Sequence, residues 1–285
     1  MEWYEKEGFD SNPFETDPFR HNYALEGQDK NKEELLYRIL SGDMLLIEGK
    51  EGSGKTALLK HAIDNFRGKG KVIYVDGKKV SKRLNIEKLL KRGVFRKTPK
   101  GMILLLDNVQ NLTKRNCERI KFYYDQDYLK SVVFTTENYA SVSFTNSIRD
   151  RIGKRIMRVK EIAKNDAVKM VKDRIGGKDT ITTEDIAKLL MLSDKNPKKL
   201  LQNSEKLYAY IVKNNKEKGD IKRIISTLKQ EEKKEEERCF ECDGKLAKIK
   251  DNWRCPSCDT YCMKCGTLVD ETDTVCPDCG EEFEE

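Results

Sequence analysis

The stretch GKEGSGKT at residues 49–56 restricts the fold of this chain more than any other. It matches the pattern G-x-x-x-x-G-K-[ST], follows the apolar run MLLIE and opens a helical pattern. In that setting glycines let backbone N–H groups surround phosphates, and the helix N-terminus favours their negative charge. The stretch therefore predicts a nucleotide-phosphate site formed by Gly49, Glu51, Gly52, Ser53, Gly54, Lys55, Thr56 and Ala57.

Apolar runs alternate with helical patterns between residues 41 and 160. This alternation predicts crossover units on a parallel sheet with helices on both faces, which is the α/β fold of P-loop NTPases. Three helical patterns without strands follow and predict a small all-helical lid. The expected strands are residues 44–49, 71–77, 102–107, 131–136 and 154–160, and the expected helices include 30–42, 55–66, 85–92, 164–175, 182–193 and 196–215.

Changes in composition along the chain predict five parts. They are an N-terminal segment (1–40), a P-loop core (41–160), the helical lid (161–222), a charged helical linker (223–238) and a Cys-rich domain (239–285).

The run MILLLD at residues 102–107 carries Asp107 to the exposed end of a buried strand. We expect this strand to lie beside the one that feeds the phosphate loop. The Asp107 carboxylate and the Thr56 hydroxyl would then hold Mg²⁺, while Lys55 reaches the β- and γ-phosphates.

Asn108 stands where ATP-hydrolysing enzymes of this kind usually carry a glutamate. An amide can orient the attacking water, but it does not usefully accept a proton. Gln110 and Glu137 are candidate substitutes, and the spacing does not choose between them. Two hypotheses therefore stay open, which are slow ATP turnover and a switch that only holds its nucleotide.

Eight of the nine cysteines follow residue 238, all in Cys-x2-Cys pairs. In a chain that begins with the acidic, aromatic MEWYEKEGFD rather than a signal peptide, this spacing predicts two zinc sites of four thiolates each. Tandem pairing gives 239/242/255/258 and 262/265/276/279, whereas crosswise pairing gives 239/242/262/265 and 255/258/276/279. The predicted zinc ligands are Cys239, Cys242, Cys255, Cys258, Cys262, Cys265, Cys276 and Cys279, and the ninth thiol, Cys117, is expected to be buried and structural.

The net charge of +7 is divided unevenly. Residues 239–285 hold 12 acidic and five basic residues, a balance of −7, which leaves +14 on residues 1–238. The basic body suits DNA as a partner, and the acidic tail suits a protein partner. No apolar run approaches the length of about 18 residues that a membrane span needs. We therefore expect a cytoplasmic protein without a membrane partner.

Over about residues 20–215 these features resemble the AAA+ ATPases and their STAND relatives. The resemblance implies ATP as the nucleotide and a role for several further residues. Gly27-Gln28-Asp29 would flank the adenine, and Thr135 or Thr136, of which we favour Thr136, would sense the γ-phosphate. Arg149 or Arg151, with Arg151 favoured, would act as an arginine finger in a homo-oligomer, and Lys198 replaces the usual sensor-2 arginine of the lid.

Within these families two resemblances imply different functions. NPFETDPF and the Asn-Pro of the lid resemble archaeal initiator and ExeA-type ATPases, which implies coupling of the nucleotide state to DNA binding or to loading of a DNA-processing complex. LLLDNVQN with VVFTT resembles the STAND switches, which implies an ATP-bound adaptor that recruits a protein through its zinc tail. The tail itself resembles a double zinc ribbon or an all-cysteine RING.

Overall fold

The computed structural model describes residues 2–78, 89, 100–214, 224–227, 245–249, 252–270 and 273–283. The chain divides into two compact units, Met1–Lys218 and Gly219–Glu285. Most of the expected helix 85–92, most of the charged linker, and Cys239 and Cys242 lie outside the described residues.

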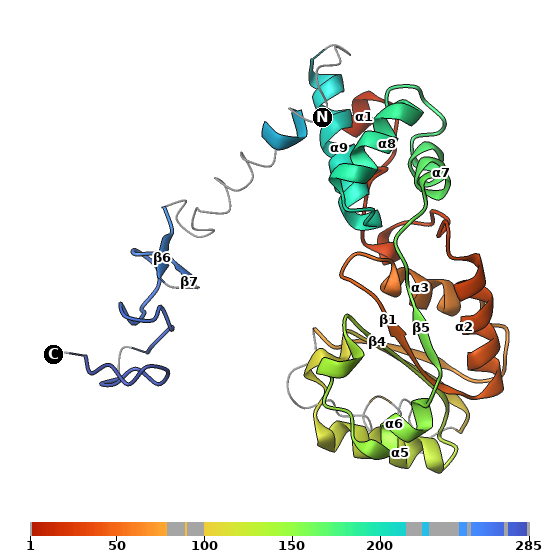
Figure 1. Cartoon of the computed structure of the whole chain (residues 1–285), viewed down its shortest axis with the longest axis vertical. Coiled ribbons are helices and arrows are strands. Elements are labelled where there is room, and N and C mark those ends of the chain that lie inside the picture. The colour runs from red at the N-terminus through yellow and green to blue at the C-terminus, as the bar shows by residue number, and fades with distance from the viewer. Residues whose placement is uncertain are drawn as a thin grey trace. The chain divides into compact units, whose positions relative to one another are not determined.

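A five-stranded parallel sheet forms the centre of the first unit (Figure 1). The five expected strands are all present, and their order in the sheet is β2-β3-β4-β1-β5. Their bounds are β1 Met44–Glu48, β2 Val72–Asp76, β3 Met102–Asp107, β4 Leu129–Thr136 and β5 Ile156–Arg158.

The expectation that the strand ending at Asp107 lies beside the strand before the phosphate loop is wrong. β4 lies between them, pairing with β1 on one side and with β3 on the other. β4 is buried at every position except Lys130, so it fits the middle of a sheet covered on both faces. Strand order depends on contacts between distant residues, which the local apolar pattern does not report.

Alternate residues of the strands supply two separate cores. Leu45 and Ile47 of β1 pack with α2 (Asp29–Ser41) and α3 (Lys55–Asn65). Met44 and Leu46 face the opposite side and pack with α5 (Lys114–Asp125) and α6 (Asn146–Ile152). Helices therefore cover both faces of the sheet, as the alternation predicts. Short 3-10 turns, η2 (Val109–Asn111) and η3 (Tyr139–Ser141), follow β3 and β4.

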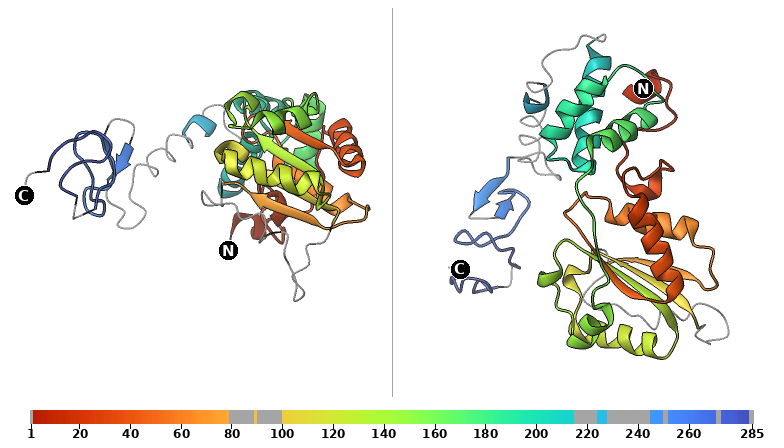
Figure 2. Two further views of the ribbon diagram at one scale, coloured as in Figure 1. Left: turned by 90° about the horizontal axis from the view of Figure 1, so that it is seen from below. Right: turned by 45° about the vertical axis from the view of Figure 1, so that its right-hand side comes forward.

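Three helices after the sheet form the lid, at one end of the first unit (Figures 1 and 2). They are α7 (Lys164–Arg174), α8 (Thr183–Leu192) and α9 (Pro197–Lys213). The side chains of Thr182 and Asn196 cap α8 and α9 by accepting backbone N–H groups, as expected for these residue types.

The N-terminal segment packs on the lid before it reaches the sheet. α1 (Trp3–Lys6) lies against α9, where the Trp3 ring is 5.2 Å from that of Tyr208. Farther along the segment, the turn η1 (Pro18–Arg20) contacts α3, and Phe19 packs on Tyr74 of β2 at 4.8 Å between ring centres. The segment thus contacts both the lid and the sheet domain.

The second unit contains small β-elements around its cysteines. β6 (Ala247–Ile249) and β7 (Asn252–Arg254) pair antiparallel, and the Gly266 and Gly280 N–H groups bond back to the carbonyls of Cys262 and Cys276. Both glycines have positive φ, which their lack of a side chain permits. Among the described helices of either unit, none is long and apolar enough to cross a membrane.

Candidate functional site

The phosphate loop connects β1 to α3, as predicted. Gly52 and Gly54 adopt φ values of 73° and 104°, which bend the loop around the start of α3. Lys55 is 6% exposed, and its Nζ donates to the carbonyls of Gly49 at 2.7 Å and Lys50 at 2.9 Å. Burial lowers the pKa of Lys55, and the nearby charges of Glu137 and Asp107 oppose this effect. The loop thus carries a buried cation beneath its backbone.

Asp107 lies beside the start of α3 although β4 separates its strand from β1. Its Oδ2 accepts hydrogen bonds from Thr56 Oγ1 at 2.7 Å and from Tyr74 Oη at 3.1 Å, and its Oδ1 accepts from Thr135 Oγ1. The carboxylate is 1% exposed. One carboxylate and a threonine hydroxyl in contact supply the oxygen donors that Mg²⁺ prefers, so these residues fit the ion.

Tyr74 is a part of this site that the sequence analysis missed. Its hydroxyl reaches Asp107 from β2, and burial together with the Asp107 charge raises its pKa. The phenol therefore stays protonated and keeps donating to the carboxylate. Tyr74 could have been noticed in the sequence because it is the one hydroxyl-bearing residue of β2, on the face that packs with α3.

A cavity of about 560 Å³ opens over the loop. Its walls come from residues 21–26 of the N-terminal segment, from the phosphate loop, and from the lid residues Met170, Arg174 and Leu201. Asn108 and Glu137 also line it. Gly27, one of the predicted adenine-flanking residues, lies against Asp166 of α7 and does not line the cavity. Residues 21–26, which precede it, line the cavity instead.

The comparisons with known proteins agree with this geometry. Residues 41–160 match the sequence model of the AAA domain family. No curated protein matches the sequence of the chain.

The folds of several solved AAA+ proteins are similar to this chain. The Orc1 protein of Aeropyrum pernix in complex with DNA is 14% identical, with a TM-score of 0.58 over 74% of this chain and 67% of that one. A RuvB mutant of Thermotoga maritima gives 16% identity and 0.55 over 72% and 71%. Domain III of the replication initiation protein DnaA from the same organism gives 18% and 0.54 over 77% and 97%. At these identities the likeness establishes an AAA+ P-loop ATPase fold.

Three predicted site residues of the AAA domain lie away from the cavity. Thr136 bonds to the carbonyl of Asn138 at 3.3 Å, and it is Thr135 that contacts Asp107. Arg149 donates to the carbonyl of Val142 at 2.9 Å and lies over the Tyr139 ring. Arg151 makes two hydrogen bonds to the Asp125 carboxylate, at 2.9 and 2.8 Å. Neither arginine reaches the cavity of its own chain.

The lid contacts the phosphate loop through the start of α9. Asn196 Nδ2 donates to the carbonyl of Glu51 at 2.6 Å, and the Lys198 N–H donates to the carbonyl of Gly52 at 3.2 Å. Lys198 Nζ also lies 3.3 Å from Glu51 Oε1, and this partner lowers the pKa of Glu51. A Cβ on Gly52 would lie 2.7 Å from the Lys198 Cβ, so a side chain there would push the lid away. Lys198 thus reaches the phosphate loop from the lid.

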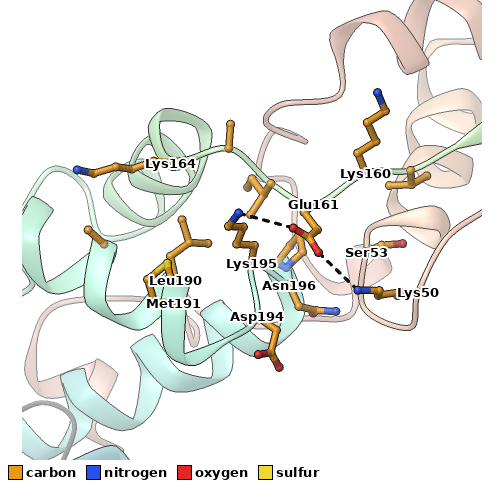
Figure 3. A pocket seen from close by; sticks show the side chains of 15 residues that line it. Lys50, Ser53, Lys160, Glu161, Lys164, Leu190, Met191, Asp194, Lys195 and Asn196 are labelled. Atoms are coloured by element: carbon orange, nitrogen blue, oxygen red, sulfur yellow. Dashed lines mark hydrogen bonds and ion pairs between the residues drawn. The ribbon is translucent and has the colours of Figure 1, made fainter.

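A second cavity, of about 890 Å³, is lined by Lys50 and Ser53 of the phosphate loop, by residues 159–164 and by residues 187–197 of the lid in part (Figure 3). Figure 3 shows Glu161, on the segment between β5 and α7, between two lysines. It pairs with Lys50 of the loop at 3.5 Å and with Lys195 of the lid at 3.8 Å. All three side chains are at least half exposed, so these ion pairs contribute little to stability.

In the second unit, four of the predicted zinc ligands form one group. The sulfur atoms of Cys262 and Cys279 are 3.6 Å apart, those of Cys265 and Cys276 are 3.5 Å apart, and all four lie within 4.8 Å of one another. Zn–S bonds of about 2.3 Å in a tetrahedron place sulfurs about 3.8 Å apart, so the group fits zinc. This grouping is that of the tandem pairing. Cys255 and Cys258 lie outside it, and their predicted tandem partners lie outside the described residues.

Proposed function

We propose that this chain is an ATP-binding AAA+-type ATPase of slow turnover that couples its nucleotide state to DNA binding or to loading of a DNA-processing complex. The observation that carries the proposal is the contact between Thr56, which lines the loop cavity, and the buried Asp107. It supports the proposal because a threonine hydroxyl and a carboxylate are oxygen groups of the kind that hold the Mg²⁺ of a bound nucleotide.

The roles of the loop residues follow from their positions. Lys55 would leave the loop carbonyls to bind the β- and γ-phosphates, and Thr56 with Asp107 would hold Mg²⁺. The Asn196 side chain and the Lys198 N–H of the lid bond to carbonyls of the loop backbone, so the occupancy of the loop would change how firmly the lid closes. We infer that this closure alters the surface that a partner meets.

DNA is the favoured partner because of charge and similarity. Residues 1–238 carry a balance of +14, which attracts a polyanion. The Aeropyrum pernix Orc1 structure, whose fold is similar, contains DNA.

Steady-state ATP turnover with and without DNA tests the proposal. The wild-type chain should hydrolyse ATP slowly, and DNA should change the rate. Lys55→Ala should lose turnover and at least tenfold in nucleotide affinity. Lys188→Ala, an exposed lysine of α8 outside the cavity, should match the wild type. DNA affinity should fall steeply with salt, and the DNA part of the proposal is wrong if neither binding nor turnover responds.

A switch or adaptor is the second candidate. Asn108 donates its amide to Asp76 instead of offering a carboxylate to the cavity, which favours a held nucleotide. The acidic Cys-rich unit, with two Zn²⁺ ions bound, would then recruit a protein. Turnover approaching about one per second, which is ordinary for an enzyme, would exclude this candidate.

A further inference from the structure

We infer that Glu137 is the carboxylate that takes the proton of the attacking water, in place of the glutamate that position 108 lacks, and that Gln110 positions it. The inference rests on the proposed ATP hydrolysis and goes beyond it by assigning the base.

The amide at position 108 is already engaged. Asn108 adopts a left-handed backbone with φ of 54°, and its N–H donates to Thr135 Oγ1 at 3.0 Å. Its Nδ2 donates to Asp76 Oδ1 at 3.1 Å. Asp76 also accepts from the Lys78 N–H at 3.0 Å and does not line the loop cavity. The Asn108–Asp76 pair therefore supplies no base to the cavity.

The other acidic side chains of the cavity can be compared by their partners. Five line it, and four of these five pair with basic side chains. The pairs are Asp17 with Arg20, Glu26 with Lys169, Glu51 with Lys198 and Asp64 with Lys60. The fifth is Glu137. Among the described residues its hydrogen-bond partner is an uncharged amide, Gln110 Nε2 at 3.5 Å from Oε1. Glu137 is thus the one of these five carboxylates that forms no ion pair with a basic side chain in the described part of the chain.

Its place in the sheet puts Glu137 at the phosphate end of the cavity. It directly follows β4, the strand that lies between the loop strand and the strand of Asp107. It lines the cavity together with Lys55, Thr56 and Asn108. Its charge also acts on Lys55, where it raises the pKa more than Asp107 does. A carboxylate near the phosphate-binding lysine is near the γ-phosphate that this lysine would hold.

Gln110 leaves one carboxylate oxygen available. Its amide approaches Oε1, and no described residue donates to Oε2, so Oε2 could accept a hydrogen bond from water. In the reaction the water oxygen bonds to the γ-phosphorus, and the bond from this phosphorus to the β–γ bridging oxygen breaks. The water proton passes to Glu137, and ADP and phosphate are the products. Glu137 then returns the proton to solvent.

Glu137→Gln tests the assignment, because it removes the base and keeps the size of the side chain. Loss of a general base should slow turnover about 100-fold or more, with nucleotide affinity within about twofold of wild type. The variant should also retain ATP, so nucleotide extracted after single-turnover mixing should be ATP where the wild type yields ADP. Glu184→Gln, an exposed glutamate of α8 outside the cavity, is the matched control and should behave as wild type.

Three other results would contradict the assignment in different ways. Wild-type binding of ATP without turnover would reject the hydrolysis in the proposed function, and the base with it. Equal turnover of wild type and Glu137→Gln would reject the base alone. A joint loss of affinity and turnover in Glu137→Gln would make Glu137 a binding residue.

Gln110→Ala tests the positioning role separately. It should slow turnover several-fold without changing nucleotide affinity, and it should have no further effect in the Glu137→Gln background, because the two side chains act as one unit. Additive losses in the double variant would show that Gln110 acts elsewhere.

Discussion

Three hydroxyl groups converge on the Asp107 carboxylate, and each comes from a different element. Thr56 belongs to α3, Tyr74 to β2 and Thr135 to β4. A buried carboxylate that accepts several hydrogen bonds is held in one orientation, and a metal site needs its ligands held in this way. Thr56 and Asp107 could be predicted because each belongs to a local motif. Tyr74 could not, since its role depends on the pairing of β2 with β3.

The choice between Thr135 and Thr136 illustrates the same limit. Adjacent strand residues face opposite sides of a sheet, so only one of the two can face Asp107. The sequence does not fix the alternation relative to α3. The structure places the Thr135 hydroxyl on Asp107 and bonds that of Thr136 to a carbonyl beyond the strand.

His21 gives a prediction about pH at the residue scale. It lines the loop cavity, where burial, with the Arg174 charge as the second cause, lowers its pKa to about 4. The Tyr23 N–H and Arg174 Nη2 lie next to the two ring nitrogens. A neutral ring can accept from one of these donors and a protonated ring from neither, so protonation is disfavoured here. Between pH 6.5 and 4 the unfolded chain binds this proton and the folded chain does not, so stability falls as the pH falls.

His21→Asn keeps an acceptor near the Tyr23 N–H and removes the titration. The wild type should lose more unfolding free energy than the variant between pH 6.5 and 4. The difference should be on the order of 1 kcal/mol, because His21 is only partly buried and solvent screens the effect. Urea unfolding at several pH values measures it. Parallel pH profiles for the two proteins would show that His21 titrates normally.

At the scale of elements, the sequence predicts the strands and lid helices well because each has a local signal. The apolar run MILLLD predicts a buried strand, and β3 is buried at every position. Thr182 and Asn196 directly precede helical patterns, and each caps its helix. The order of strands and the path of the N-terminal segment over the lid are not local. Aromatic packing of Trp3 and Phe14 on Tyr208 joins residues about 200 positions apart, which no periodicity reports.

The two capping residues of the lid provide a matched test of its contact with the loop. Asn196 caps α9 and also donates to the Glu51 carbonyl, whereas Thr182 caps α8 with its side chain on the Asp185 N–H. Replacing either by Ala should cost about 1 kcal/mol of stability. Only Asn196→Ala should also weaken nucleotide binding, by several-fold in a titration with fluorescent ATP. Equal affinities in the two variants would mean that the contact does not respond to nucleotide.

At the scale of the whole molecule, charge and cysteines divide the chain at the same place, after residue 238. The basic balance lies on residues 1–238 and the acidic balance on the Cys-rich remainder. A piece of this size cannot bury enough apolar surface to fold by itself, so zinc would supply its folding free energy. The spacing of the cysteines predicted the metal but left the pairing open, since either pairing closes loops of acceptable length.

The zinc pairing can be tested by counting metal ions in the full chain. If the pairing is tandem, Cys262 and Cys276 are ligands of the same ion, as their grouping suggests. Cys262→Ser with Cys276→Ser should then reduce the zinc content from about two per chain to about one. If the pairing is crosswise, these cysteines belong to different sites, and both ions should be lost. Cys262→Ser with Cys265→Ser is the control, because either pairing places these two on one ion and predicts the loss of one. Mass spectrometry of the metal content decides between the outcomes, and nucleotide affinity should stay unchanged in both variants because the loop cavity is lined by the first unit alone.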